Sequence, residues 1–171
     1  LSLTSRDKGE NPVAMAGFPH HQLDQYLAKI IAAGYRAAVC EQMEDPQAAK
    51  GIVKRDITRI VSRGTLTDDT LLDPLAGNYL AAVVASGDAA GIAWVDISTG
   101  RFWATAVDKP RVADELARIS PAELLVSEAA VAELPTLWTE GRAVTTRPPW
   151  VFSVEQASDT LTRHFGTQSL E

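Results

Sequence analysis

Residues 14–61 read AMAGFPHHQLDQYLAKIIAAGYRAAVCEQMEDPQAAKGIVKRDITRIV, and the order of patterns in this stretch decides the fold of the first part of the chain. From Leu23 onward the apolar residues recur at helical spacing, which predicts an amphipathic helix. Gly34 stands where a left-handed residue would close that helix. The inward positions of the predicted helix are Leu23, Tyr26, Leu27, Ile30 and Ile31.

The remainder of the stretch predicts two strands joined by a turn of helix. Residues 35–41 (YRAAVCE) form a short apolar run that is typical of a strand buried on both faces. Asp45-Pro46 supplies an N-cap and a first helical residue, which predicts a one-turn helix that stops at Gly51. Residues 53–61 (VKRDITRIV) combine β-branched residues with approximate alternation and predict a strand. Together these elements predict a small mixed-sheet α/β module.

The second half of the chain predicts a different α/β arrangement. Residues 62–77 combine Gly, Pro, Thr and Asp and are interpreted as a linker. A meander of three strands, a helix, a strand and a last helix follow, and this order fits a ribonuclease-H-like fold. The predicted strands are 78–85, 91–98, 100–107 (joined to its predecessor by a tight turn at Thr99-Gly100) and 123–127. The predicted helices are 111–119, with Val112, Leu116 and Ile119 inward, and one capped by Ser153 and Gln156, with Val154, Ala157, Leu161 and Phe165 inward.

Composition limits the class of protein. The 171 residues are 46% hydrophobic and 22% charged, which suits one medium or two small globular domains. Cys40 is the only cysteine, so no intramolecular disulfide can form, and no apolar run approaches the roughly 18 residues of a membrane span. The polar N-terminus has no signal-peptide core and no initiator Met, so we expect a cytosolic, soluble piece of a longer chain.

Charge is distributed unevenly along the chain. The net charge is −6, yet residues 1–63 carry 9 basic against 7 acidic residues, and residues 64–171 carry 7 against 15. Five cations, Lys50, Lys54, Arg55, Arg59 and Arg63, fall within 14 residues. On a strand, the three arginines share parity, so we expect them to project from one face and to follow a phosphate backbone. The alternative is a solvated strand edge that deters aggregation.

The segment before the predicted helix is the second candidate site. Residues 1–13, with the breakers Gly9 and Pro12, predict a loop, and AMAGFPHHQ continues it with Met15, Phe18 and Pro19. Apolar side chains on a loop can enter a DNA minor groove. The alternative is a loop packed against its own sheet.

Other residue patterns argue against catalysis. His20 and His21 are adjacent, so their side chains diverge, and a metal site there is not favoured. Asp96 lies in a predicted strand, where a nuclease of this fold would place a metal ligand; the alternative is an acid that caps the neighbouring hairpin turn. The phosphate-binding loop G-x-x-x-x-G-K-[ST] and the motifs G-x-G-x-x-G, G-x-S-x-G and H-E-x-x-H are absent from the sequence. We therefore expect no enzyme activity in this chain.

Longer segments carry a resemblance. The loop AMAGFPHH, the helix start HQLDQYLAKI, the block VCEQMEDP and the tail KGIVKRDITRIVSRGT are similar to the bacterial MutS mismatch-repair proteins. The later segments NYLAAVV, VDISTGRF, PAELLVSE and HFGTQSLE resemble the next domain of the same family. The resemblance implies residues 1–65 as the latter part of the mismatch-binding domain, 66–77 as a linker, 78–165 as a ribonuclease-H-like connector domain and 166–171 as the start of the lever and core region.

The resemblance also implies a function for the parent protein. The parent is expected to bind mispaired or looped-out bases in duplex DNA, to self-associate as a dimer, to recruit MutL partly through the connector, and to work in the bacterial cytoplasm at the nucleoid. ATP and Mg²⁺ would bind in a domain that this chain lacks, and no cofactor or metal is expected here. The implied DNA-binding residues are Met15, Gly17, Phe18, Lys54, Arg55 and Arg59, with Ala16 and Pro19 in the same segment.

One departure limits what the resemblance implies. Family members read the mismatch with a Phe-x-Glu motif, and no Phe of this sequence is followed two residues later by Glu. We expect that motif upstream of Leu1, outside this chain. Two alternatives stay open: a metal-dependent nuclease built around Asp96, and a protein-binding adaptor that does not read mismatches.

Overall fold

The computed structural model describes residues 2–5, 14–47, 49, 51–67, 72–73 and 76–170. The chain forms two compact units, Leu1–Ser62 and Arg63–Glu171, which are described separately below. Both combine helices with β-sheet, which confirms the predicted α/β class. The predicted breakers Gly9 and Pro12, the cation Lys50, parts of the predicted linker and Glu171 lie outside the described residues.

The first unit begins with a pair of short strands where a loop was predicted. β1 (Ser2–Ser5) pairs antiparallel with β2 (Ala14–Gly17), with Ser2 opposite Gly17 and Ser5 opposite Ala14. The loop prediction was therefore wrong for residues 2–5 and for AMAG, and its remaining residues, 1 and 6–13, lie outside the described residues. Strands of only 4 residues hold too few alternations to be distinguished from a loop by pattern alone.

The predicted helix of the first unit is confirmed. A short 3₁₀-helix, η1 (His20–Gln22), leads directly into α1 (Leu23–Ala32), whose Leu27 and Ile31 are buried. Gly34 adopts φ +86° and the Tyr35 amide donates to the carbonyl of Ile30, so the chain leaves the helix through a left-handed residue as predicted.

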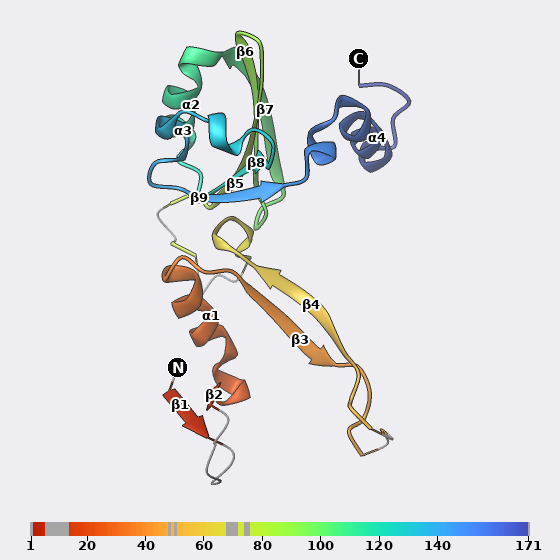
Figure 1. Ribbon diagram of the computed structural model, residues 1–171. Helices are drawn as coiled ribbons and strands as arrows, with labels where there is room; N and C mark the ends of the chain where they lie inside the picture. The colour runs from red at the N-terminus through yellow and green to blue at the C-terminus, as the bar shows by residue number, and fades with distance from the viewer. Residues whose placement is uncertain are drawn as a thin grey trace. The chain divides into compact units, whose positions relative to one another are not determined.

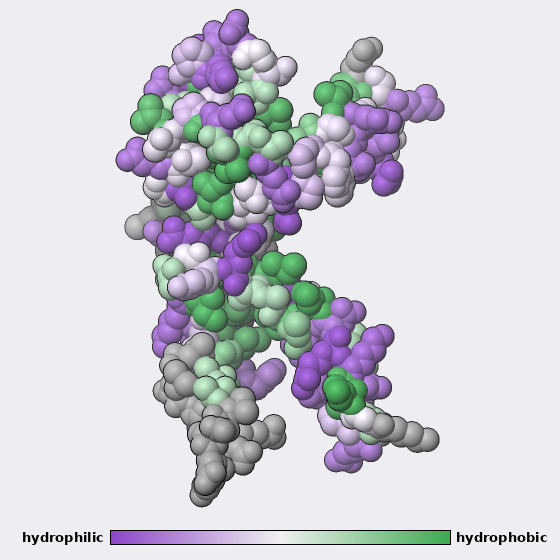
Figure 2. Space-filling view, viewed as in Figure 1, coloured by the Kyte–Doolittle hydropathy of each residue, from purple (hydrophilic) through white to green (hydrophobic). Residues whose placement is uncertain are grey.

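The two strands after α1 form an antiparallel hairpin, drawn in orange to yellow in Figure 1. They are β3 (Ala37–Gln42) and β4 (Arg55–Val61). Burial of β3 on both faces was wrong: Ala37 and Val39 are half-buried, whereas Ala38 and Cys40 are exposed. Among the described residues, β3 and β4 pair only with each other. Helix α1 contacts β3 and covers one face of the hairpin, and the other face is exposed. Figure 2 shows hydrophobic surface along this hairpin beside hydrophilic side chains.

The connection between β3 and β4 begins with the predicted cap. Asp45 accepts a hydrogen bond at its side chain from the Gln47 amide (2.9 Å) and at its carbonyl from the Ala49 amide (3.1 Å). These are the bonds of an N-cap residue and of a single helical turn, although the described residues there, 43–47, 49 and 51, form no regular helix.

The second unit is built on a five-stranded sheet with the order β7-β6-β5-β8-β9. β6 is antiparallel to both β5 and β7, whereas β5, β8 and β9 run parallel. The strands are β5 (Tyr79–Ser86), β6 (Ala89–Asp96), β7 (Arg101–Asp108), β8 (Glu123–Ser127) and β9 (Ala143–Arg147). The helices are α2 (Val112–Ile119), α3 (Thr136–Thr139) and α4 (Val154–Phe165). The ribonuclease-H-like assignment stays a prediction, which this strand order supports.

The core of the second unit lies between the sheet and α2. Val112, Leu116 and Ile119 of α2 are buried against the sheet, as predicted. Trp138 of α3 joins the same cluster at 3% exposure. Neither α3 nor β9 was predicted. Both are short, and the threonines and arginine of β9 give no hydrophobic signal that a sequence pattern could detect.

The start of the second unit is anchored through a buried carboxylate. Glu123 on β8 is 3% exposed. One of its oxygens accepts from the amide of Gly64 in the 3₁₀-helix η2 (Arg63–Thr65), and the other accepts from the hydroxyl of Thr145, at 2.9 and 2.7 Å. A Cβ on Gly64 would lie 2.8 Å from the Glu123 Cβ, so only glycine permits this approach.

The last helix differs from its predicted packing. Ser153 caps α4 by accepting from the Gln156 amide at 3.2 Å, but the Gln156 side chain bonds Thr160, so only half of the predicted capping box forms. No residue of α4 is buried, and Val154 and Phe165 are 86% and 59% exposed. The predicted inward face is therefore wrong, because among the described residues α4 contacts mainly the preceding 3₁₀-helix, η5 (Pro149–Phe152).

Candidate nucleic-acid interface

A β-bulge in the β3–β4 hairpin decides where the predicted cations point. Arg55 lies opposite Gln42, but the register shifts between Val39 and Cys40, so that Arg59 lies opposite Val39 and no residue of β3 lies opposite Thr58. The Thr58 hydroxyl donates to the Val39 carbonyl at 3.3 Å. Cross-strand partners share a face, and Gln42 and Val39 lie on opposite faces of β3. Arg55 and Arg59 therefore project from opposite faces, and their predicted alignment was wrong because the extra residue reverses the alternation.

Arg63 does not extend the row of cations either. It lies in η2, beyond the end of β4, and belongs to the second unit. The strand therefore contributes two of the three predicted arginines, one to each face.

Arg59 faces α1, where it meets an acidic side chain. Its guanidinium Nη2 lies 3.4 Å from the Asp24 Oδ1 in the first turn of the helix. Both side chains stay largely in solvent, at 44% and 58% exposure. Val61, on the same face of β4, is buried, whereas Ile57 and Ile60 on the opposite face are 55% and 63% exposed.

Lys54 and Arg55 lie where β4 leaves the turn. The Lys54 backbone is fixed on both sides: its amide donates to the Glu44 carboxylate at 2.6 Å, and its carbonyl accepts from the Met43 amide at 2.9 Å. Both cationic side chains are exposed, and within the described part of the chain neither forms an ion pair. The backbone there is held while the charges remain available.

The segment before α1 presents one exposed and one engaged apolar side chain. Met15 on β2 is 42% exposed, and no atom of the described residues lies within 4 Å of the position that a Gly17 Cβ would occupy. Phe18, in contrast, stacks on Tyr26 of α1 with ring centroids 4.4 Å apart and an interplanar angle of 15°. Lys29 Nζ lies 4.9 Å from the centre of the Tyr26 ring. Phe18 thus packs on a helix of its own unit, and not on the sheet that the alternative named.

The six predicted site residues therefore fall into two groups within the first unit. Phe18 and Arg59 both contact the first turn of α1, through the Phe18–Tyr26 stack and the Arg59–Asp24 pair, and Met15 and Gly17 lie on β2, just before Phe18. Lys54 and Arg55 lie further along the hairpin. His20 lines an apolar hollow between α1 and β3, and no group of three potential metal ligands occurs in the described ranges.

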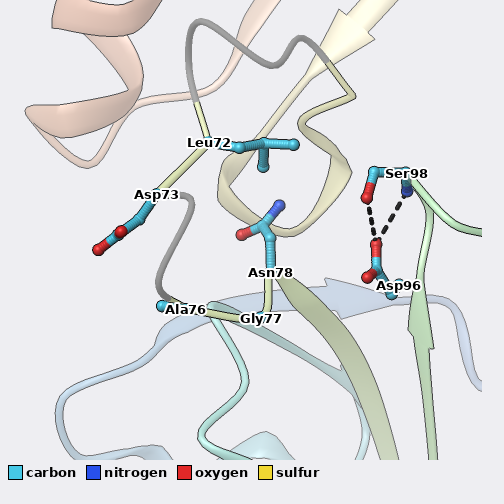
Figure 3. Close-up of a pocket in the computed structure, with 7 residues that line it drawn as sticks. All are labelled: Leu72, Asp73, Ala76, Gly77, Asn78, Asp96 and Ser98. Carbon is cyan, nitrogen blue, oxygen red and sulfur yellow. Dashed lines mark hydrogen bonds between the residues drawn. The ribbon is translucent and has the colours of Figure 1, made fainter.

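Asp96 caps the hairpin turn between β6 and β7, as its alternative reading predicted. Its Oδ1 accepts from the Ser98 hydroxyl and amide at 2.6 and 3.0 Å (Figure 3). It also accepts from the Thr99 amide at 3.3 Å. The Ser98 hydroxyl is the main cause that holds the pKa of Asp96 below the usual aspartate value of 3.8. The predicted two-residue turn is in fact a four-residue loop, 97–100, because Asp96 pairs with Arg101.

The comparison with protein families assigns both units. The family model described as MutS domain I matches residues 1–70, and MutS domain II matches residues 78–171. The chain belongs to the MutS family.

Individual MutS proteins align along the whole chain. The DNA mismatch repair protein MutS of Rhodopirellula baltica is 52% identical over 195 residues, which cover 100% of this chain and 21% of that protein. The MutS of Syntrophomonas wolfei is 43% identical, with the same coverage of 100% and 21%. The MutS of Methanothrix thermoacetophila is 44% identical over 93% of this chain and 18% of its own length. The chain therefore spans about a fifth of the length of the curated relatives it matches.

Two functional features of this MutS-family chain escaped the sequence patterns. The pairing of Asp24 with Arg59 joins residues 35 positions apart, and it depends on the bulge at Thr58, which no residue type marks. The buried Glu123 sits in a strand whose apolar neighbours dominate the pattern. Within the described ranges, no helix combines the length and apolar character needed to cross a bilayer.

Proposed function

We propose that this chain is the part of a DNA mismatch-recognition protein that holds the duplex around a mispaired or looped-out base. The first unit would bind DNA and the second would connect it to the rest of the parent. The match of residues 1–70 to MutS domain I supports this assignment, as do relatives named DNA mismatch repair protein MutS. In the finer division, residues 1–65 belong to the mismatch-binding domain, 66–77 to the linker, 78–165 to the connector and 166–171 to the start of the lever and core region.

The observation that carries the proposal is the pair of free cations on the hairpin. Lys54 and Arg55 are exposed, and the Lys54 backbone is fixed by Glu44 and Met43. Phosphate binding gains affinity from released counterions and requires cations that are not already neutralised. These two side chains meet that requirement, and Arg59 meets it only in part because Asp24 is beside it.

The apolar segment would contribute shape rather than base reading. Met15 is exposed and Gly17 leaves open space, so this strand would let a DNA backbone or groove approach closely. Phe18 is occupied by its stack on Tyr26 and would support that surface instead of entering the base stack. Selection of the mismatch itself would then require the Phe-x-Glu motif, which the sequence lacks.

The test is fluorescence anisotropy of the chain with a matched and a singly mismatched duplex across a salt series. We expect sequence-independent binding at low salt with a steep salt slope, which Lys54→Ala plus Arg55→Ala reduces by about 2 because about 0.9 is lost per phosphate contact. Glu155→Gln, an exposed change in the second unit, serves as control. No binding at low salt would refute the DNA-holding role and favour the adaptor alternative.

The remaining activities belong to the parent protein and are proposed with it. The second unit, in which residues 64–171 carry 7 basic against 15 acidic residues, would offer a docking surface for MutL. The parent would form a dimer, would bind ATP with Mg²⁺ and hydrolyse it in another domain, and would act at the nucleoid in the cytoplasm. Co-purification of MutL with this chain tests the docking, and loss of co-purification in the second unit alone would place the contact elsewhere.

A further inference from the structure

The bulge at Thr58 turns Arg59 away from the other hairpin cations. If Thr58 were paired and β4 alternated regularly from end to end, Arg59 would share a face with Arg55 and Ile57. With the bulge, the guanidinium is directed to the first turn of α1, where Asp24 lies 3.4 Å away. β-Bulges often re-aim a side chain beside a functional site.

The ion pair is poorly suited to hold the fold together. It joins one guanidinium nitrogen to one carboxylate oxygen at 3.4 Å, and both side chains are about half exposed. Pairs of this kind contribute little to stability. The arginine has five N–H donors, so most of them stay available to another acceptor while the carboxylate remains nearby. Asp24 therefore affects this surface mainly through its negative charge, and little through the stability that the ion pair adds.

We propose that Asp24 restrains the sequence-independent affinity of this chain for DNA by competing with backbone phosphates for Arg59. The inference rests on the proposed DNA-holding role of the first unit and adds a residue that sets its strength. A phosphate that approaches Arg59 must displace the carboxylate or accept its repulsion. Arg59 thus releases fewer counterions on binding than Lys54 or Arg55, which have no acidic partner in the described part of the chain.

Such a restraint changes how well the protein distinguishes mismatched from correctly paired DNA. A repair protein meets a vast excess of correctly paired DNA, so its selectivity depends on the ratio of specific to non-specific affinity. A carboxylate beside a phosphate-binding arginine lowers the backbone contribution, which is the same for every sequence. The carboxylate does not affect contacts that other residues of the protein make to DNA deformed at a mismatch.

The experiment compares Asp24→Asn, Arg59→Gln and the double variant with the unaltered 171-residue chain on one matched duplex, by anisotropy from low to moderate salt. We expect Asp24→Asn to tighten binding about two- to five-fold at low salt, the range of an exposed ion pair. The salt slope should steepen by up to about 0.9 as Arg59 becomes a full phosphate contact. In the Arg59→Gln background, Asp24→Asn should have no more effect than Glu155→Gln, the control in the second unit.

Each result separates this inference from the proposed function. Binding that Lys54→Ala plus Arg55→Ala weakens but Asp24→Asn leaves unchanged would retain the DNA-holding role and overturn the restraint. Weaker binding by Asp24→Asn, with a folded circular dichroism spectrum, would show that Asp24 positions Arg59 instead of restraining it, which also overturns the inference. Equal tightening by Asp24→Asn and Glu155→Gln would reduce the effect to net charge and overturn it too. Absence of binding by every variant would overturn both proposals.

Discussion

At the scale of single residues, the second unit depends on one buried carboxylate and one glycine. Both oxygens of Glu123 accept hydrogen bonds, from the Gly64 amide and the Thr145 hydroxyl, so the buried charge is compensated by polar donors. Gly64 is itself buried, and its missing side chain allows η2 to lie on β8. The two residues form one joint between η2 and β8: the missing side chain of Gly64 allows the close approach, and the Glu123 carboxylate accepts from the Gly64 amide.

This joint predicts a large effect of one added methyl group. Gly64→Ala would place a Cβ 2.8 Å from the Glu123 Cβ and 2.9 Å from the Leu80 Cδ1, so we expect the free energy of unfolding to fall by about 1–3 kcal/mol. Gly91→Ala is the matched control, because no atom lies within 4 Å of its added Cβ. Urea unfolding of both variants measures the difference, and equal midpoints would contradict the packing described for Gly64.

Asp96 predicts a pH dependence. Hydrogen bonds from Ser98 and Thr99 lower its pKa in the folded protein, so the carboxylate stabilises the fold above the unfolded pKa. That contribution is lost as the pH falls from about 4 through the lowered pKa. Asp96→Asn should therefore reduce the loss of stability in this acid range and destabilise the chain at neutral pH. Urea midpoints of both chains between pH 7 and pH 2.5 test it, and parallel curves would rule out the capping role.

At the scale of elements, the two longest helices of the second unit have similar patterns and different surroundings. Both α2 and α4 are amphipathic, but three residues of α2 are buried and none of α4. Periodicity reports that a helix has an apolar face, and not whether another element covers it. This is why the inward residues of α2 were predicted correctly and those of α4 were not.

The contrast predicts opposite outcomes of similar substitutions. Leu116→Ala on α2 removes a fully buried side chain and should cost about 2–5 kcal/mol of unfolding free energy. Phe165→Ala on α4, where the ring is 59% exposed, should change it by less than about 0.5 kcal/mol. Thermal unfolding followed by circular dichroism distinguishes them. A large loss from Phe165→Ala would mean that α4 packs on its unit in solution.

Sequence patterns predicted elements whose own residues carry a strong period, such as α1, α2 and the meander β5 to β7. Sequence patterns failed where an element is defined by a strand far away in the sequence, or where one additional residue shifts the register. β1 and β2 are defined only by each other, and β9 by its place beside β8. The bulge in β4 needs one unpaired residue, and Thr58 is an ordinary strand residue. The candidate site was therefore predicted by residue type, whereas its division into two groups was not.

At the scale of the whole molecule, core and charge are separated between the units. The largest buried cluster, from Ala81 to Trp138, lies entirely within the second unit. Residues 1–62 carry 8 basic against 7 acidic residues, whereas residues 63–171 carry 8 against 15. Stability and affinity for a polyanion should therefore follow different parts of the chain.

This separation predicts the behaviour of a truncated chain. Residues 63–171 alone should unfold cooperatively, because they retain η2, Glu123 and the whole buried cluster. The same fragment should not bind DNA at low salt, because it has lost Lys54, Arg55 and Arg59. Calorimetry and anisotropy on one preparation test both statements. A non-cooperative fragment would show that the first unit supports the second, and DNA binding by the fragment would place phosphate contacts outside the first unit.

The unpaired Thr58 also determines how a substitution scan of β4 must be interpreted. In a regular strand, effects repeat at every second position, and a change of period is taken as loss of the strand. In β4 the alternation shifts by one residue at the bulge. Positions 55, 57 and 60 lie on one face of the hairpin, and positions 56, 59 and 61 lie on the other. Deletion of Thr58 would remove the bulge and leave every other cross-strand pair in place, so Arg55 and Arg59 would still face opposite sides of the hairpin. The side that each cation faces is thus set by the residue of β3 opposite which it lies, and not by the spacing of the two arginines in the sequence.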